Sequence, residues 1–127
     1  MKNKFIMIID DDPDETAIFC EAIETFDSNV QCINFNQPEK ALEYLQNQQS
    51  VLPNWIFLDL NMPRIDGIEC LKRIKTINHL SSVPVIMYST SSLKADIENT
   101  KKLGANGYLI KPDNFEKIYI EAKKWMI

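Results

Sequence analysis

The sequence predicts an α/β fold built on a parallel β-sheet. Five short apolar runs are expected to be strands: Phe5 to Ile9, Val30 to Phe35, Trp55 to Leu58, Val83 to Tyr88 and Gly107 to Ile110. Five amphipathic segments of helical length alternate with these runs. The runs are apolar almost throughout, which is typical of strands that helices cover on both faces of a parallel sheet. With 127 residues, the chain fits a single domain, residues 1–127, with a substantial core.

Four short motifs mark the expected helix starts. Each places Asp or Asn three residues before Glu, the spacing of a capping box: Asp12 to Glu15, Asn36 to Glu39, Asp66 to Glu69 and Asp113 to Glu116. Apolar residues at helical spacing follow three of these motifs and are expected to face the core: Phe19, Ala22, Ile23 and Phe26; Ile68, Leu71, Ile74 and Ile77; Phe115, Ile118, Ala122 and Trp125. The segment from Ser92 to Leu103 has few large apolar side chains, so we expect it to be the least anchored helix.

Composition excludes several classes of function. The 14 basic and 18 acidic residues give a net charge of −4 without a basic run, so neither nucleic acid nor a membrane surface is an expected partner. The only histidine, His79, follows a predicted helix, which disfavours a catalytic Ser/His/Asp or Cys/His set. The three cysteines, Cys20, Cys32 and Cys70, are widely spaced and odd in number. We therefore expect free thiols in a reducing compartment, and the sequence shows no secretory signal, which favours a cytoplasmic location.

Acidic residues follow two of the predicted strands. Asp59 comes directly after Trp55 to Leu58, and Asp10, Asp11 and Asp12 follow the first strand. If the first and third strands are neighbours, their carboxyl ends bring these carboxylates to one edge of the sheet. Crowded carboxylates repel one another unless some are protonated or a cation binds among them, and Mg²⁺ prefers such oxygen ligands. Asp12 is better explained as a helix cap.

Hydroxyl and ammonium groups follow the last two strands. Ser89 to Ser92 end the fourth run, and Lys111 with Pro112 ends the fifth. Alone, such serines would be capping residues and such a lysine would be solvated. Together with the acids they form a set suited to phosphoryl transfer, in which a carboxylate accepts the phosphoryl group and fixed donors match the charge on its oxygens.

These motifs resemble those of a response-regulator receiver domain of two-component signalling. The resemblance covers nearly the whole chain and rests on IIDDDP, LDLNMPRIDG, PVIMYST and GYLIKP, which occur in the family's order. It implies a flavodoxin-like, five-stranded parallel sheet in the order 2-1-3-4-5, with five helices on its two faces. It also implies that Asp59 is the phosphoacceptor.

The same resemblance implies a role for each further position. The Mg²⁺ ligands would be Asp10, often through water, Asp11, Asp59 and the backbone carbonyl of Asn61. Lys111 would pair with phosphoryl oxygens, Ser89 and Tyr108 would form the switch, and Asn61 and Ser91 would tune the lifetime of the phosphorylated state. The bond between Lys111 and Pro112 would be cis. Ser89 replaces the commoner threonine but keeps the hydroxyl.

The expected function is that of a stand-alone receiver in a phosphorelay. It would take a phosphoryl group from a histidine kinase or a phosphotransfer protein, with Mg²⁺, and control an unknown downstream protein through the surface of the fourth helix, fifth strand and fifth helix. No catalysis is expected beyond its own phosphorylation and dephosphorylation, and the chain should be a monomer or weak dimer.

Three other functions are compatible with parts of this pattern. One is a receiver-like docking module that works without phosphorylation. Another is a Mg²⁺-dependent phosphohydrolase, which is disfavoured because Asn61 stands where a second aspartate would act as general acid. A flavin-binding domain is disfavoured because the acidic loop after the first strand would repel a phosphate.

Overall fold

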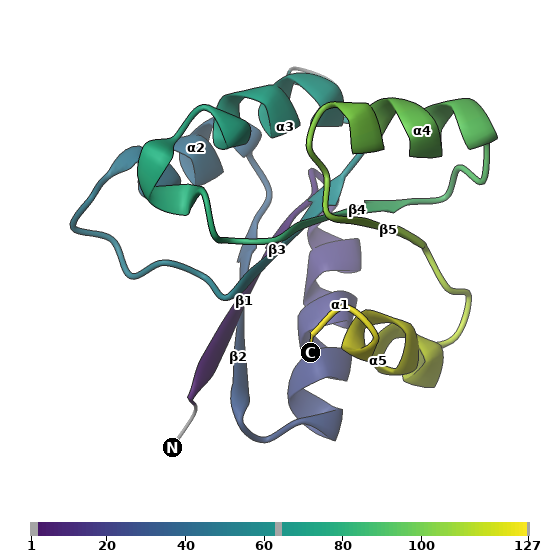
Figure 1. The fold of residues 1–127 in the computed structure, drawn as a ribbon. Coiled ribbons are helices and arrows are strands. Elements are labelled where there is room, and N and C mark those ends of the chain that lie inside the picture. Colours follow the sequence, from purple (N-terminus) through teal and green to yellow (C-terminus); the bar gives the residue numbers. More distant parts are fainter. Residues whose placement is uncertain (1–2, 63–64, 127) are drawn as a thin grey trace.

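The computed structural model describes residues 3–62 and 65–126 (Figure 1). Residues 63 and 64, inside the LDLNMPRIDG motif, lie outside the described residues, as do residues 1, 2 and 127. Strands and helices alternate along the chain: β1 (Lys4–Ile9), α1 (Pro13–Phe26), β2 (Val30–Phe35), α2 (Pro38–Gln46), β3 (Trp55–Asp59), α3 (Gly67–Lys75), a 3₁₀ turn (Asn78–Leu80), β4 (Val85–Ser89), α4 (Lys94–Lys102), β5 (Gly107–Ile110) and α5 (Phe115–Lys123). The predicted fold class is confirmed.

The five strands form one parallel sheet in the order β2-β1-β3-β4-β5. Helices α2, α3 and α4 cover one face, and α1 and α5 cover the other (Figure 1). The last residue of β1, Ile9, pairs with Phe35 of β2 and with Leu58 of β3. The residues that follow these three positions therefore meet at one edge of the sheet.

Side chains of the central strands alternate between two cores. In β1, Phe5, Met7 and Ile9 pack on the side of α2 and α3, whereas Ile6 and Ile8 pack on the side of α1 and α5. Both faces of the sheet are thus buried, which explains the nearly continuous apolar runs in the sequence.

The capping predictions are confirmed at two helices and wrong at two. Asp12 accepts hydrogen bonds from the backbone N–H groups of Asp14 and Glu15, and Asp66 caps α3. At α2 the capping position is Gln37, which makes no side-chain capping bond, and at α5 it is Asn114 rather than Asp113. Since Asn and Asp can both cap, two adjacent candidates such as 113 and 114 cannot be told apart by type.

Some residues assigned to core faces are partly exposed. Phe26, Phe115 and Trp125 have exposed fractions of 44%, 37% and 38%. Each lies at or beyond a helix end, where the covering layer stops. The weak anchoring expected for α4 is confirmed, because just one of its residues, Thr100, is buried.

The expectation of three free thiols is wrong for two cysteines. Cys20 of α1 and Cys32 of β2 form a disulfide, with their Cα atoms 5.1 Å apart, while Cys70 is free and buried. The spacing of 12 residues gave no hint of this pairing, which arises because α1 packs back against β2. Among the described residues, no helix is long and apolar enough to cross a membrane.

Candidate functional site

The candidate site lies at the carboxyl ends of β1, β3, β4 and β5. Asp10 directly follows β1 and is 1% exposed, and Asp59 is the last residue of β3 and is 5% exposed. The backbone N–H of Asp10 donates to the carbonyl oxygen of Phe35, so the parallel pairing continues one residue beyond β1. The sheet edge therefore buries two carboxylates side by side, as strand order and register dictate.

Three aspartates form a cluster that fits a metal ion. Carboxylate oxygens of Asp10, Asp11 and Asp59 all lie within 4.8 Å of one another. Such closely spaced, hard oxygen donors suit a small divalent cation, which would also relieve their mutual repulsion. The predicted ligand side chains are thus brought together. Asn61, predicted to contribute its backbone carbonyl, lies close enough for its backbone N–H to favour the charged form of Asp59, which lowers the pKa of that carboxyl and offsets part of the effect of burial.

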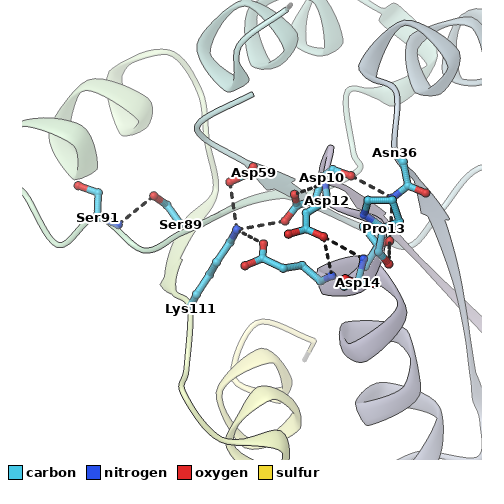
Figure 2. Close-up of polar contacts among 11 residues, drawn as sticks. Asp10, Asp12, Pro13, Asp14, Asn36, Asp59, Ser89, Ser91 and Lys111 are labelled. Atoms are coloured by element: carbon cyan, nitrogen blue, oxygen red, sulfur yellow. Dashed lines mark hydrogen bonds and ion pairs between the residues drawn. The ribbon is translucent and has the colours of Figure 1, made fainter. Parts of the chain in front are cut away.

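Lys111 reaches into the same cluster from the end of β5 (Figure 2). Its Nζ atom lies 3.1 Å from Asp10 Oδ2 and 3.3 Å from Asp59 Oδ1. It also lies 5.4 Å from the centre of the Tyr88 ring, in cation–π geometry. The side chain is only 12% exposed, so its charge acts in a poorly solvated space.

Burial and ion pairing shift the pKa values of this cluster. Burial raises the pKa of Asp10 to about 7, aided by a hydrogen bond with Glu15. Burial also raises the pKa of Asp59, although Lys111 offsets part of the effect. For Lys111 burial lowers the pKa, but its ion pairs with the carboxylates outweigh burial and raise it overall. Lys111 therefore stays protonated, while Asp10 holds a proton easily when no cation is bound.

Two residues of the site were missed by the sequence analysis. Glu15, assigned only to a capping box, places Oε2 2.5 Å from Lys111 Nζ. The side-chain amide of Asn36 donates to the backbone carbonyl of Asp10 at 3.1 Å and to Thr16 Oγ1 at 2.8 Å (Figure 2). The signal for Asn36 was present, since it follows the second strand as Asp10 follows the first. Its spacing from Glu39 instead favours a helix cap.

The predicted switch residues are connected through Ser91. Ser89 is fully buried, and its Oγ accepts a hydrogen bond from the backbone N–H of Ser91 at 3.0 Å. The Tyr108 hydroxyl donates to the backbone carbonyl of Ser91 at 2.9 Å, and the Ser91 hydroxyl donates to Asp96 Oδ2 at 2.5 Å. The loop between β4 and α4 is thus hydrogen-bonded through Ser91 to Ser89 at the end of β4 and to Tyr108 of β5. Ser91 therefore connects the two predicted switch residues.

One expectation for the site is wrong. The bond between Lys111 and Pro112 is trans, as are the peptide bonds throughout the described residues. The trans isomer is the lower-energy form of an X–Pro bond, and the sequence contains no local feature that excludes it.

A parallel five-stranded sheet with three clustered acids and a lysine at its carboxyl edge defines a receiver-type α/β domain. The profile of the response regulator receiver domain matches residues 6–123, and the chain belongs to this family. Receiver domains of this family act in two-component systems, where they bind a divalent metal ion and interact with kinases and downstream effectors.

Known relatives agree with the assignment. The chain is 31% identical over 120 residues to the response regulator Rcp1 of Synechocystis sp., covering 91% of this chain and 82% of Rcp1. The structure of the Mn²⁺-bound form of Rcp1 superposes with a TM-score of 0.84 at 30% identity, over 97% of this chain and 94% of that one. The phosphorylated cyanobacterial phytochrome response regulator RcpA also gives a TM-score of 0.84, at 28% identity, over 97% of this chain and 91% of that one.

Proposed function

We propose that the protein is a phosphorylatable receiver whose phosphoacceptor is Asp59. The observation that carries this proposal is the burial of the Asp59 carboxylate between two further acids and the Lys111 ammonium. A carboxylate oxygen of Asp59 would attack phosphorus as the bond to the donor breaks, and the donor would leave with the bonding electrons. The proposed donor is a histidine kinase or a phosphotransfer protein.

The proposed cofactor is Mg²⁺, held by Asp10, Asp11, Asp59 and the backbone carbonyl of Asn61. Receiver domains bind a divalent metal, and the relative Rcp1 is described in an Mn²⁺-bound form. When bound, the cation would neutralise charge on the phosphoryl oxygens. Lys111 would match the charge on those oxygens from its own side of the site, as a preorganised donor.

The proposed switch uses Ser89, Ser91 and Tyr108. Ser89 would hydrogen-bond the new phosphoryl group, and Tyr108 would rearrange with the loop to which both are tied. Reversing a two-state equilibrium from 1:99 to 99:1 needs about 5.5 kcal/mol. Several charge-assisted hydrogen bonds in a buried site supply energies of this order. Asn61 and Ser91 are the proposed residues that tune the lifetime of the phosphorylated state.

The proposed output surface is the face of α4, β5 and α5. A groove of about 290 Å³ lies there, with Ile97, Thr100, Tyr108 and Trp125 in its lining. Because α4 is the least buried helix, a change in the loop before it can move it at low cost. The downstream partner is proposed to be a protein, and the cytoplasmic location and the monomeric or weakly dimeric state remain predictions.

The test is direct phosphorylation of the purified protein. It is incubated with Mg²⁺ and a small acyl phosphate, and intact mass spectrometry follows the phosphoryl adduct. We expect an adduct with the wild type and with the control Asp113→Asn, an exposed acid beyond Lys111, but none with Asp59→Asn. Absence of an adduct in the wild type would contradict the proposal and favour a docking module that works without phosphorylation.

A further inference from the structure

Of the three carboxylates that contact the Lys111 ammonium, the nearest is Glu15, which does not belong to the aspartate cluster. Its Nζ lies 2.5 Å from Glu15 Oε2, compared with 3.1 Å to Asp10 and 3.3 Å to Asp59. Glu15 belongs to the first turn of α1, which follows the acidic loop directly, and its backbone N–H donates to the capping side chain of Asp12. The lysine, which follows β5, is therefore also held by the first turn of α1.

A bound cation would leave Glu15 as the main partner of Lys111. Asp10 and Asp59 belong to the cluster that fits a metal, whereas Glu15 does not. A divalent cation among the aspartates would repel the Lys111 ammonium. It would also bind Asp10 and Asp59 and so weaken the attraction of these two carboxylates for the lysine. The pairing of Lys111 with Glu15 should consequently persist in the state that receives a phosphoryl group.

We propose that Glu15 competes with the incoming phosphoryl group for the Lys111 ammonium and so slows phosphorylation of Asp59. This inference rests on the function proposed above and adds to it a positioning residue that sets the rate. During transfer the new bond joins an Asp59 oxygen to phosphorus, the bond to the donor breaks, and the non-bridging oxygens carry negative charge. Lys111 can match that charge only after exchanging one anionic acceptor for another.

Glu15 has room to leave the lysine. Its side chain is 42% exposed, whereas that of Lys111 is 12% exposed. Both residues border a surface hollow of about 420 Å³ whose lining also includes Ile18 and Phe115. The carboxylate can therefore turn into solvent and be rehydrated while the ammonium stays beside Asp59. An ion pair whose carboxylate is partly exposed is a modest barrier, and we expect its removal to change the rate roughly two- to tenfold.

The test compares Glu15→Gln with the wild type and with Asp14→Asn. Glu15→Gln keeps the length of the side chain and removes its charge. Asp14→Asn removes the same charge from an exposed neighbour and reports the general electrostatic effect on an anionic donor. With Mg²⁺ and a small acyl phosphate, we expect the phosphoryl adduct to form two- to tenfold faster in Glu15→Gln. The rate of Asp14→Asn should stay close to that of the wild type.

A second measurement needs no metal. With a chelator present to remove divalent cations, Lys111 is acylated by a water-soluble, amine-reactive reagent. The modified peptide is then quantified by mass spectrometry. The lysine of Glu15→Gln should react faster, because its amine has lost its shortest ion pair. Equal labelling of the two proteins would show that Glu15 does not hold the lysine and would overturn the inference.

The outcomes separate this inference from the proposed function. If the wild type forms an adduct and Glu15→Gln forms it no faster, the role of Glu15 is overturned and Asp59 remains the phosphoacceptor. Equal acceleration by Asp14→Asn overturns it too, since general charge would then explain the rate. If neither the wild type nor Glu15→Gln forms an adduct, the proposed function fails and the inference fails with it.

Discussion

The phenolic hydroxyl of Tyr108 donates a hydrogen bond to the backbone carbonyl oxygen of Ser91 at 2.9 Å. This bond ties β5 to the loop between β4 and α4. The same residue, Ser91, donates its backbone N–H to Ser89 Oγ and its hydroxyl to Asp96 Oδ2. A single loop position thus connects the proposed switch hydroxyl, the proposed switch aromatic and the first turn of α4.

Removing the Tyr108 hydroxyl should loosen this loop. Tyr108→Phe keeps the ring and deletes one hydrogen bond, so we expect a loss of about 1 kcal/mol in the free energy of unfolding. Amide hydrogen exchange should become faster in residues 90–94, as measured by mass spectrometry. Tyr44→Phe is the matched control, because the Tyr44 hydroxyl donates to the backbone carbonyl of Val51 in another loop. Unchanged exchange in residues 90–94 of Tyr108→Phe would contradict the coupling.

Stability of the metal-free protein should depend on Asp10. Burial raises the pKa of Asp10 from its ordinary 3.8 to about 7, so between these values the folded chain holds a proton that the unfolded chain releases. The free energy of unfolding should therefore fall as pH rises from about 4 to 7, by an amount on the order of 3 kcal/mol. The raised pKa of Asp59 acts in the same direction, and the lowered pKa of Glu15 acts in the opposite one.

This pH dependence is measured by urea unfolding in chelator at about pH 5 and about pH 7.5. In Asp10→Asn the difference in unfolding free energy between the two conditions should shrink, because the main titrating group is gone. Adding Mg²⁺ to the wild type at the higher pH should restore stability by binding the folded state. A wild type equally stable at both pH values without metal would rule out the buried, proton-binding carboxylate.

Gly67 should tolerate no side chain, because it lies against the backbone that follows Asp59. A Cβ atom at this position would lie 2.6 Å from the carbonyl oxygen of Leu60 and in closer conflict with that of Asp59. The backbone N–H of Gly67 also donates to the Leu60 carbonyl at 2.9 Å. Gly67→Ala should lower the free energy of unfolding by about 3 kcal/mol and weaken metal binding.

Gly107→Ala is the matched control for Gly67→Ala. A Cβ atom on Gly107 would contact only the Trp125 ring among its nearest neighbours, at 2.7 Å, and this partly exposed side chain can turn away. We expect a loss of about 1 kcal/mol, measured by chemical denaturation. A Gly67→Ala protein as stable as Gly107→Ala would show that the chain after β3 can move aside.

The three cysteines should differ in reactivity. Burial raises the pKa of the Cys70 thiol to about 12, so almost no thiolate forms below about pH 10. Without reductant, the native protein should react with none of its cysteines. One thiol should appear after unfolding, and three after unfolding with reduction, because Cys20 and Cys32 are paired. Two or more thiols titrated in the unfolded, unreduced protein would contradict the disulfide.

The sequence by itself determined the strands, the layers and the main residues of the site. Strand identity follows from apolar runs, and Asp10, Asp59, Ser89 and Lys111 are placed by their position at strand ends. These rules act over a few residues, and the parallel order of the strands then brings the ends together. The predicted cluster of acids and lysine needed no knowledge of side-chain packing.

The tertiary structure alone decided the contacts between elements far apart in the chain. Glu15 and Lys111 are separated by 96 residues, and Asn36 and Asp10 by 26. Glu15 and Asn36 each fit a local capping motif, and no local pattern indicates their contacts with Lys111 and Asp10. The disulfide of Cys20 and Cys32 likewise depends on how α1 packs against β2. Packing direction is a property of the whole core, which is why local patterns could not predict these pairs.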